Sequence, residues 1–296
     1  MAVSPPRPKM PSLNSLRAFE AAARLASIAR AADELGVTPA AIAQHVKFLE
    51  AWAGERLFKR NPQGIELTAL GNNVLSDFTI AFDQLGLAVQ KLRSSAAPRE
   101  IRIAALPSIA QLWLSPCLPD IRAAMPDISI SVTALEYPPN MDREPYDLAI
   151  FYEDHSVSDN SIVICQDIIF PVCSPAIASR LNNPADLANE VFLHDTTWHD
   201  DWKTWLNRAL PNRRLVKSGP AYSLYSLAVE ETKNGAGLLI GHDALVRSLI
   251  DSGSLVAPFE QSAALDRSLT IKTAKPIEPG SVLENTVDRI IESRRS

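Results

Sequence analysis

At 296 residues the chain is longer than one ordinary hydrophobic core requires, so at least two folding units are expected. Hydrophobic residues make up 46% of it and charged residues 21%, and no run approaches the ~20 apolar residues of a membrane-spanning helix, which excludes a transmembrane protein and predicts a soluble one. The net charge of −5 divides into +3 for residues 1–95 (11 Lys and Arg against 8 Asp and Glu) and −8 for the rest (18 against 26), so a nucleic-acid partner is not excluded for the N-terminal third.

The chain begins with a proline-rich segment. Residues 1–10 contain three prolines before Met10 and no apolar stretch, so we predict a disordered tail there and not a secretory signal. On this basis the protein is expected in the cytoplasm.

Three helices are predicted after the tail. Apolar residues at three- and four-residue spacing from Leu13 indicate the first helix. The second begins at Ile28 and ends at Gly36, the residue type best suited to a left-handed C-terminal cap. The third begins with Thr38 as N-cap and Pro39 as first helical residue, because the missing proline N–H would be unpaired there in any case. Two helices joined by a short, glycine-containing turn are typical of a helix-turn-helix motif.

The third helix is predicted to lie in the major groove of DNA. Its spacing predicts a buried stripe of Ile42, Val46 and Leu49, which leaves the other faces for contact with bases. The apolar residues there would contact base edges and the polar ones would hydrogen-bond them. The residues of this helix expected to bind DNA are Thr38, Pro39, Ala41, Gln44, His45 and Lys47.

A β-hairpin wing is predicted next. Two strand-like runs, 56–60 and 64–67, flank the turn-forming sequence Asn61-Pro-Gln-Gly64. Phosphate contacts, which add affinity without sequence information, are expected from Lys59 and Arg60 on the wing and from Lys47 and Arg30 on the helices. The winged helix-turn-helix domain is thereby placed over residues 11–68.

Thr68 can cap a further helix, predicted over residues 69–95. Its apolar positions step by three and four residues, a pattern that pairs one helix with another, so we expect a dimerisation linker. The seam consists of Leu70, Val74, Phe78, Ala81, Leu85, Ala88 and Leu92.

From about residue 96 the pattern changes to alternating strands and helices. A strand over 100–105, a helix over 109–114 and strands over 128–133 and 146–151 predict an α/β domain with a parallel sheet and right-handed crossovers. Further strands are expected near 162–165, 168–173, 238–240 and 255–257, and further helices near 175–181, 201–209, 223–234 and from 243.

Several strings in the N-terminal third resemble the DNA-binding domain of LysR-type transcriptional regulators. They are Leu16-Arg-Ala-Phe-Glu-Ala-Ala-Ala23, Ala31-Ala-Asp-Glu-Leu-Gly-Val-Thr-Pro-Ala-Ala-Ile42, Gln44-His-Val-Lys47, Leu57-Phe58, Leu67-Thr68 and Gly71. The strings 37–42 and 44–47 are similar to the branch that contains glycine-cleavage activators and β-lactamase regulators. Ala43 stands where the family usually has a serine, which puts one polar DNA contact in doubt.

The C-terminal two thirds resemble the effector domain of the same family, through Asp147-Leu-Ala-Ile150, Phe170-Pro-Val-Cys-Ser-Pro175, His194-Asp-Thr-Thr-Trp198 and Gly235-Ala-Gly237. The resemblance implies a two-lobed α/β domain similar to periplasmic binding proteins over residues 96–296, with lobe I at about 96–164 and 267–296 and lobe II at about 165–266. It also implies a homodimer through the linker helix, commonly a tetramer, with promoter DNA and a small-molecule effector as partners and RNA polymerase as a further candidate. A sequence-specific regulator of transcription, without enzymatic activity, is the expected function.

Ligands in such sheets bind beyond the carboxyl ends of the strands, where helix N-termini present unpaired N–H groups. The sequence does not identify the effector; the helix N-termini alone suggest a small anionic metabolite such as an amino acid or carboxylate. The residues expected to bind it are Ser108 and Ile109 from one lobe, Phe151 and Tyr152 at the hinge, and Thr196, Thr197, Tyr222 and Ser223 from the other; ordinary capping or packing is the alternative for each.

Other conspicuous side chains are predicted to be structural. Trp198, Trp202 and Trp205 recur at helical spacing, which favours core packing over an aromatic ligand box. The acidic pairs 153–154, 200–201 and 230–231 are adjacent and not convergent, so solvated surface is favoured over metal ligation or acid–base chemistry.

The cysteines and histidines carry no recognised motif. Cys117, Cys165 and Cys173 lack CxxC spacing and a nearby histidine, so reduced and mostly buried thiols are expected, with no disulfide and no metal site. The histidines form no nucleophile–base set, and a nucleophile elbow, a phosphate loop and an HExxH motif are all missing from the sequence. No cofactor is expected.

Two rival classes were weighed. A solute-binding protein or enzyme built on the two-lobed domain would bind or turn over a ligand without DNA affinity, which leaves the N-terminal module unexplained. A nucleoid-type architectural protein would bind DNA with little sequence preference, which leaves the acidic second domain unexplained.

Overall fold

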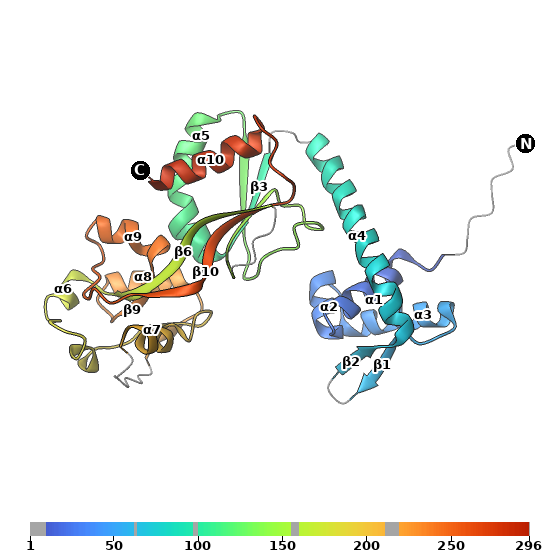
Figure 1. The fold of residues 1–296 in the computed structure, drawn as a ribbon, viewed down its shortest axis with the longest axis horizontal. Helices are drawn as coiled ribbons and strands as arrows, with labels where there is room; N and C mark the ends of the chain where they lie inside the picture. The colour runs from blue at the N-terminus through green and yellow to red at the C-terminus, as the bar shows by residue number, and fades with distance from the viewer. Residues whose placement is uncertain (1–9, 62–63, 97–99, 155–159, 211–218, 296) are drawn as a thin grey trace, which may run out of the picture. The chain divides into compact units, whose positions relative to one another are not determined.

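The computed structural model describes residues 10–61, 64–96, 100–154, 160–210 and 219–295. They fall into two compact units, Met1–Arg93 and Ser94–Ser296 (Figure 1). Within these ranges no helix combines the length and apolar character needed to cross a membrane. The disordered tail predicted over residues 1–10 lies almost wholly outside the described residues.

The first unit is a small helical bundle with a two-stranded hairpin. Its elements are α1 (Leu13–Arg24), α2 (Ile28–Leu35), α3 (Pro39–Ala53), β1 (Phe58–Asn61), β2 (Gly64–Leu67) and α4 (Ala69–Ala96). The predicted caps are confirmed: Gly36 ends α2 at φ 64°, and the Thr38 hydroxyl accepts a hydrogen bond from the backbone N–H of Ala41 at 3.2 Å. The Thr68 hydroxyl likewise accepts from the N–H of Gly71 at 3.1 Å.

A single core holds this unit together. Phe19 of α1 is fully buried and its ring lies 5.6 Å from that of Phe58 in β1 and 5.7 Å from that of Phe78 in α4. The buried Glu20 carboxylate accepts hydrogen bonds from Arg24 at 3.0 Å and from the hydroxyl of Thr79 in α4 at 3.1 Å. These contacts fix the first half of α4 against α1.

The apolar seam of α4 therefore divides into two parts. Leu70, Val74 and Phe78 pack against the core of their own unit and are half-buried. Farther along, Leu85 and Leu92 remain 46% and 71% exposed. The first half of the predicted dimerisation seam thus packs within its own unit, and the exposed apolar side chains lie in the second half.

The second unit is built on one six-stranded sheet in the order β4-β3-β5-β10-β6-β9. The strands are β3 (Glu100–Ala105), β4 (Ser129–Ala134), β5 (Leu148–Asp154), β6 (Ser161–Val172), β9 (Leu239–His242) and β10 (Ala263–Thr273). A separate parallel pair joins β7 (His194–Asp195) to β8 (Ala221–Tyr222). The helices are a π-helix (Ile109–Leu114), α5 (Leu118–Ala124), α6 (Pro175–Ala178), α7 (Asp201–Ala209), α8 (Tyr225–Lys233), α9 (Asp243–Asp251) and α10 (Val282–Arg295).

The prediction of a parallel sheet is confirmed for the three strands on which it was based and is wrong for the rest of the sheet. The β4–β3–β5 part is parallel, but β10 pairs antiparallel with both β5 and β6, and β6 pairs antiparallel with β9. The sequence analysis assigned neither β10 nor α10, and it divided β6 into two strands. Residues 255–257 form no strand, only a single bridge between Cys173 and Val256. Pairing between segments about a hundred residues apart leaves no mark in a local pattern.

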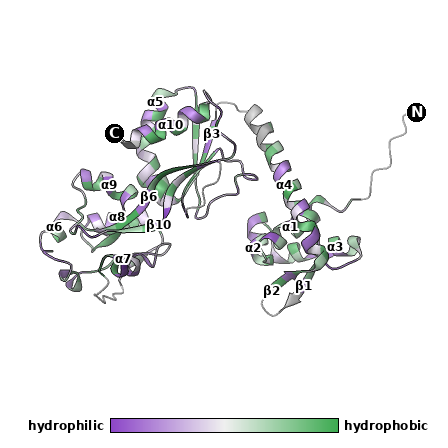
Figure 2. Cartoon of the chain, viewed as in Figure 1, coloured by the Kyte–Doolittle hydropathy of each residue, from purple (hydrophilic) through white to green (hydrophobic). Residues whose placement is uncertain are grey.

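Long strands run through both parts of this unit. Figure 1 shows β6 and β10 extending from the part that carries α5 and α10 to the part that carries α6, α7 and α9. Covering helices such as α5 and α10 carry both hydrophobic and hydrophilic residues, as helices with one buried face do (Figure 2). The register of β10 against β6 shifts between Ala264 and Ser268, so the strand is irregular where the two parts meet.

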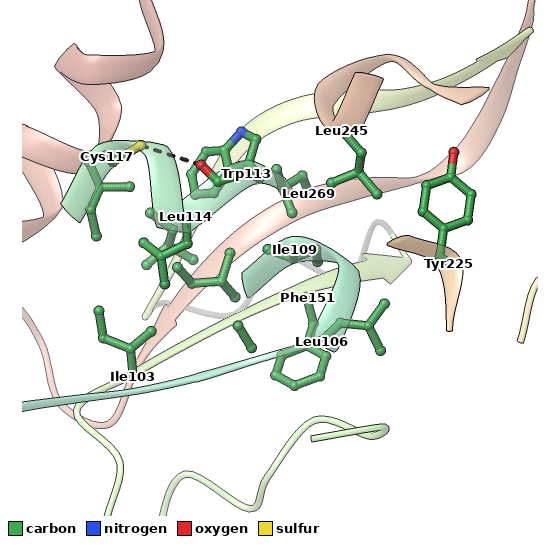
Figure 3. Close-up of a cluster of buried hydrophobic side chains, with 14 of the residues drawn as sticks. Ile103, Leu106, Ile109, Trp113, Leu114, Cys117, Phe151, Tyr225, Leu245 and Leu269 are labelled. Carbon is green, nitrogen blue, oxygen red and sulfur yellow. Dashed lines mark hydrogen bonds between the residues drawn. The ribbon is translucent and has the colours of Figure 1, made fainter. Parts of the chain in front are cut away.

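Two hydrophobic cores fill the second unit. The larger one surrounds Ile109 and includes Leu106, Phe151 and Leu269, as Figure 3 shows. The smaller one contains Phe192 and Trp202, whose rings stack at 3.9 Å, beside the fully buried Trp205. The three cysteines are free; Cys117 and Cys173 are buried and Cys165 is half-buried, as expected from the sequence.

Candidate functional site

The outer face of α3 carries the polar side chains predicted to meet DNA. Ile42, Val46 and Leu49 point into the core and are the only buried residues of this helix, as predicted. Gln44 and Lys47 are exposed on the opposite faces. The hydrophobic stripe fixes which side of α3 faces outward, so the polar residues are presented by the packing itself.

The remaining residues near the start of α3 differ in how freely they are presented. Thr38 and Pro39 are exposed and Ala41 is half-buried. The ring of His45 is half-buried, with its Nδ1 3.5 Å from the hydroxyl of Ser15 in α1. Rotation of the His45 ring toward a base edge would break this contact. No comparable side-chain hydrogen bond is found for Gln44 among the residues described.

A groove lies between α3 and the hairpin, lined among others by Gln44, Lys47, Arg56 and Ile65. The Glu50 carboxylate at one side of it accepts hydrogen bonds from the N–H groups of Leu57 at 2.8 Å and Phe58 at 3.1 Å, and so holds the start of the hairpin against α3. Ala43 also lines this groove.

The basic residues sit at the edges of this surface. Lys59 is exposed on β1, across from Glu66 on β2, and Arg30 is exposed on α2. Arg60 belongs to β1, but its side chain lies outside the described residues. Arg56 is exposed and lines the groove together with Lys47; the sequence analysis read it only as the start of a strand.

In the second unit a pocket opens where the end of β3 meets the segments around β7 and β8. It is lined by Leu106, Pro107, Ser108, Glu136, Asp195, Thr197, Trp198, Ser223, Leu224 and Tyr225. Three predicted effector residues, Ser108, Thr197 and Ser223, come together here from segments that are 89 and 26 residues apart in sequence. Ser108 is only 3% exposed, and its hydroxyl has no hydrogen-bond partner in the described ranges.

The other five predicted effector residues do not line this pocket. Ile109 and Phe151 are 0% and 3% exposed in the larger core, as Figure 3 shows. Tyr152 is half-buried, its ring 5.8 Å from that of Trp198, and its hydroxyl is buried without a hydrogen-bond partner among the residues described. Thr196 is exposed, and its N–H donates to the carbonyl of Tyr222, at 2.9 Å.

Asp195, which was not among the predicted effector residues, is the most buried charged residue in this pocket. It is 4% exposed, and its Oδ1 accepts hydrogen bonds from the N–H groups of Thr197 at 2.8 Å and Trp198 at 2.9 Å. Its Oδ2 is buried with no partner in the part of the chain that the structure describes. Burial raises the pKa of this carboxyl above its usual value. The string His194-Asp-Thr-Thr-Trp198 was the available signal, since it places an acid at the end of a short strand.

Beside the pocket lies a buried ionic cluster that no sequence motif predicted. His242, at the end of β9, is fully buried; its Nδ1 is 2.9 Å from Asp167 of β6 and its Nε2 is 3.0 Å from Asp201 of α7. Arg267 of β10 donates to Asp167 at 2.8 Å. The cluster joins three strands and a helix. Asp201 belongs to it, so the prediction that the pair 200–201 is solvated surface is wrong for Asp201.

The charges of the cluster stabilise one another. Burial alone would lower the pKa of His242, but Asp167 and Asp201 together raise it to about 9, so the ring is protonated at neutral pH. Burial alone would raise the pKa of Asp167, but His242 and Arg267 lower it below its usual value. Among the described residues no group of three or more His, Cys, Asp or Glu side chains is arranged to hold a metal ion.

The predicted tryptophan stripe divides between two roles. Trp202 and Trp205 lie in the smaller core, as expected. Trp198 precedes α7 instead of belonging to it, and its ring lies 4.0 Å from that of His242 and 5.0 Å from that of Tyr225 while lining the pocket. Helical spacing misassigned Trp198 because the helix begins only at Asp201.

Comparison with known proteins matches both units. Residues 13–72 match the family model "Bacterial regulatory helix-turn-helix protein, lysR family", and residues 94–290 match "LysR substrate binding domain". The chain is 33% identical over 255 residues to the glycine cleavage system transcriptional activator of Escherichia coli (strain K12), covering 85% of this chain and 83% of that protein. It is 30% identical over 253 residues to the HTH-type transcriptional activator AmpR of Citrobacter freundii, covering 83% and 85%.

Solved structures support the fold. The full-length virulence activator AphB of Vibrio cholerae, described as a member of the LTTR protein family, superposes with a TM-score of 0.51 at 17% identity and covers 96% of this chain and 99% of its own. The two matched models together span most of the sequence, and the expected winged helix-turn-helix, linker helix and α/β effector domain are all present. The chain therefore belongs to the LysR family, and it is a non-enzymatic, DNA-binding regulator of transcription with an effector-binding domain.

Proposed function

We propose that α3 reads the operator from the major groove. In this arrangement Gln44 and His45 hydrogen-bond base edges while Pro39 and Ala41 make apolar contacts with them. The observation that carries the proposal is that Gln44 and Lys47 are exposed on α3, away from its buried stripe, while Phe48 and Trp52 are exposed farther along the helix. Thr38 adds a hydroxyl at the edge of this face, although its oxygen is already engaged in capping the helix.

The phosphate contacts belong to the basic residues that flank this helix. Lys47 and Arg56 in the groove, Lys59 on β1 and Arg30 on α2 are exposed, and Arg60 is the neighbouring wing residue. Such contacts displace counterions and fix the protein on the duplex without selecting a sequence. Binding should accordingly weaken steeply as salt increases.

The regulator acts as a homodimer, and as a tetramer through its effector domains, with RNA polymerase as a further contact at the promoter. The second half of α4 supports the dimer, because Ile80, Leu85, Val89 and Leu92 are 60%, 46%, 44% and 71% exposed along one helix. A two-fold dimer implies half-sites separated by one helical turn of DNA or a multiple of it. The protein works in the cytoplasm, where its promoter is.

The pocket at Ser108, Thr197 and Ser223 binds the effector between lobe I, at about 96–164 and 267–296, and lobe II, at about 165–266. Ile109, Phe151, Tyr152, Thr196 and Tyr222 shape its surroundings. Effector binding changes transcription by favouring one arrangement of the lobes over another, which requires unequal affinity for the two.

A footprint tests the DNA-binding proposal. Purified full-length protein is applied, at about 150 mM salt, to the intergenic DNA upstream of its own gene. Protection of one discrete site is expected. Uniform coating would favour an architectural protein, and no protection would remove the operator from this region.

The effector site is tested separately by Ser108→Trp. The indole would fill the pocket, so the response of operator binding to the effector should be lost while operator binding itself persists. A variant that responds normally would remove Ser108 from the site.

A further inference from the structure

We propose that the pocket around Asp195 recognises its ligand through a primary ammonium group, which the Asp195 carboxylate and the Ser108 hydroxyl hold together. This inference rests on the proposed role of the pocket as the effector site and adds the chemical class of the effector. Of the small metabolites suggested by helix N-termini, an amino acid or a carboxylate, it selects those that carry an ammonium group, and it extends the class to other small amines.

The first observation is the half-used carboxylate of Asp195. One oxygen is fixed by two backbone N–H groups at 2.8 and 2.9 Å, which sets the orientation of the side chain. The other oxygen lines the same pocket, is shielded from solvent, and has no donor among the residues described. A buried carboxylate oxygen without a donor is costly, and a cationic donor is the partner that offsets most of that cost.

The second observation is the matching hydroxyl across the pocket. Ser108 is buried, lines the pocket from the end of β3, and likewise has no partner within the described part of the structure. A hydroxyl offers two lone pairs and a carboxylate offers several, whereas an ammonium group supplies three donors and no acceptor. One ammonium therefore satisfies both orphan groups at once.

The third observation is the sign of the charge at this site. The residues described as lining the pocket include two acids, Asp195 and Glu136, and no Lys, Arg or His. The nearby cations are already engaged: His242 lies between Asp167 and Asp201, and Arg267 also bonds Asp167. Among the residues described, Asp195 therefore accepts hydrogen bonds only from the backbone, and the charge of His242 favours its ionised form without a hydrogen bond between them. A carboxylate or phosphate group placed beside Asp195 would meet like charge, so the ammonium end of the ligand is the end expected there.

The raised pKa of Asp195 agrees with this geometry. Burial is its main cause, and the neighbouring Asp201 adds to it. Both effects disfavour the ionised carboxyl, and an ammonium group bound beside it would favour the ionised form.

The size of the pocket restricts the ligand further. The enclosed space is about 10 Å³, room for a group the size of one water molecule. An ammonium group is of this size, and the rest of the ligand would extend from the pocket toward solvent.

Ligand binding to the full-length protein provides the test. Thermal unfolding is followed with 10 mM each, on the order of common screening concentrations, of the L- and D-amino acids, ethanolamine and putrescine, each beside its N-acetyl derivative. At least one free amine should raise the unfolding midpoint, and its N-acetyl derivative, which lacks the cation, should not. Calorimetric titration of that amine into Asp195→Asn should then show affinity reduced about 10- to 100-fold.

Matched variants separate recognition from folding. Asp127→Asn removes the same charge from an exposed position, so its amine affinity should equal that of the wild type. Asparagine can keep the two backbone hydrogen bonds of Asp195, so the ligand-free Asp195→Asn protein should unfold no earlier than the wild type. Ser108→Ala, which leaves the carboxylate in place, should weaken amine binding by a smaller factor.

Two results would overturn the proposal. If N-acetyl derivatives bind and free amines do not, the pocket is an effector site for a different class of ligand. If neither set binds, the pocket is not an ammonium site. In both cases the footprint on operator DNA would be unchanged, so the proposed DNA-binding function stands or fails on its own experiment.

Discussion

The two units of this regulator place their polar groups in opposite ways. In the first unit Gln44, Lys47 and Lys59 are exposed, and the core beneath them is apolar. In the second unit Asp195 and His242 are buried at 4% and 0% exposure, and the ionic partners of His242 come from β6 and α7, far away in sequence. An exposed polar face suits contact with a long, uniform polyanion. An enclosed one suits discrimination among small molecules, because a buried polar group left unpaired is costly.

The units also differ in the range of the contacts that build them. The turn between α2 and α3 is fixed by Gly36 and by a hydrogen bond from Ala41 to Thr38, three residues away. The pocket and its ionic cluster depend on pairs such as Arg267 with Asp167, a hundred residues apart. A substitution that removes a local cap should therefore lower the free energy of unfolding of the first unit only slightly. Loss of one distant partner should lower that of the second unit much more.

The largest effect is expected from the smaller core of the second unit. Trp205 is fully buried, so Trp205→Ala should lower the free energy of unfolding of this unit by about 3–5 kcal/mol. Chemical denaturation of the full chain measures the loss. Leu227→Ala, on the 48%-exposed position of α8, is the control and should change stability by less than about 1 kcal/mol. Equal losses for the two variants would contradict the core assignment.

The ionic cluster should give the second unit a pH dependence of its own. His242 has a pKa of about 9 in the folded chain against an ordinary 6.5, a difference worth about 3 kcal/mol. Because the folded state binds this proton more tightly, its contribution is complete below about pH 6.5 and is lost as the pH rises through about 9. Unfolding curves between pH 6 and 10 measure the effect.

His242→Gln sharpens that test. It removes the cation between Asp167 and Asp201, so it should destabilise the second unit by about 3–5 kcal/mol at neutral pH and flatten the pH dependence between 6.5 and 9. A variant that keeps the wild-type pH profile would show that another group is responsible.

These contrasts explain what the sequence could and could not predict. Caps, turn, buried stripe and hairpin of the first unit were predicted to within a residue or two, because each depends on neighbours a few residues apart. Arg56 was not predicted to contact DNA, because its position at the start of a strand does not show that it lines the groove.

In the second unit the strand β10 was missed, and with it the antiparallel half of the sheet. Ser108, Thr197 and Ser223, three of the eight predicted effector residues, line one pocket, and the other five do not. Asp195 was not predicted as a site residue. The partners of His242 could not be predicted, because Asp167 and Asp201 are 75 and 41 residues away from it in sequence. Their meeting depends on tertiary packing alone.

The smallest expected effect on stability lies in the first unit. Thr38→Ala removes the side-chain cap of α3 and should cost about 1 kcal/mol, while Thr38→Ser should restore most of it. Thermal unfolding of the first unit is the measurement. A loss as large as that of Trp205→Ala would contradict the contrast between local and distant contacts.

The central claim is that α3 selects the sequence while the wing supplies affinity, and one titration tests it most directly. Affinity for the footprinted operator and for a scrambled duplex is measured across salt concentrations for the wild type, Gln44→Ala and Lys59→Ala. The account predicts that Gln44→Ala loses about 1–3 kcal/mol of discrimination with an unchanged salt slope, and that Lys59→Ala keeps discrimination but lowers the slope by about 1. If both variants change slope and discrimination alike, the division of labour between α3 and the wing is contradicted.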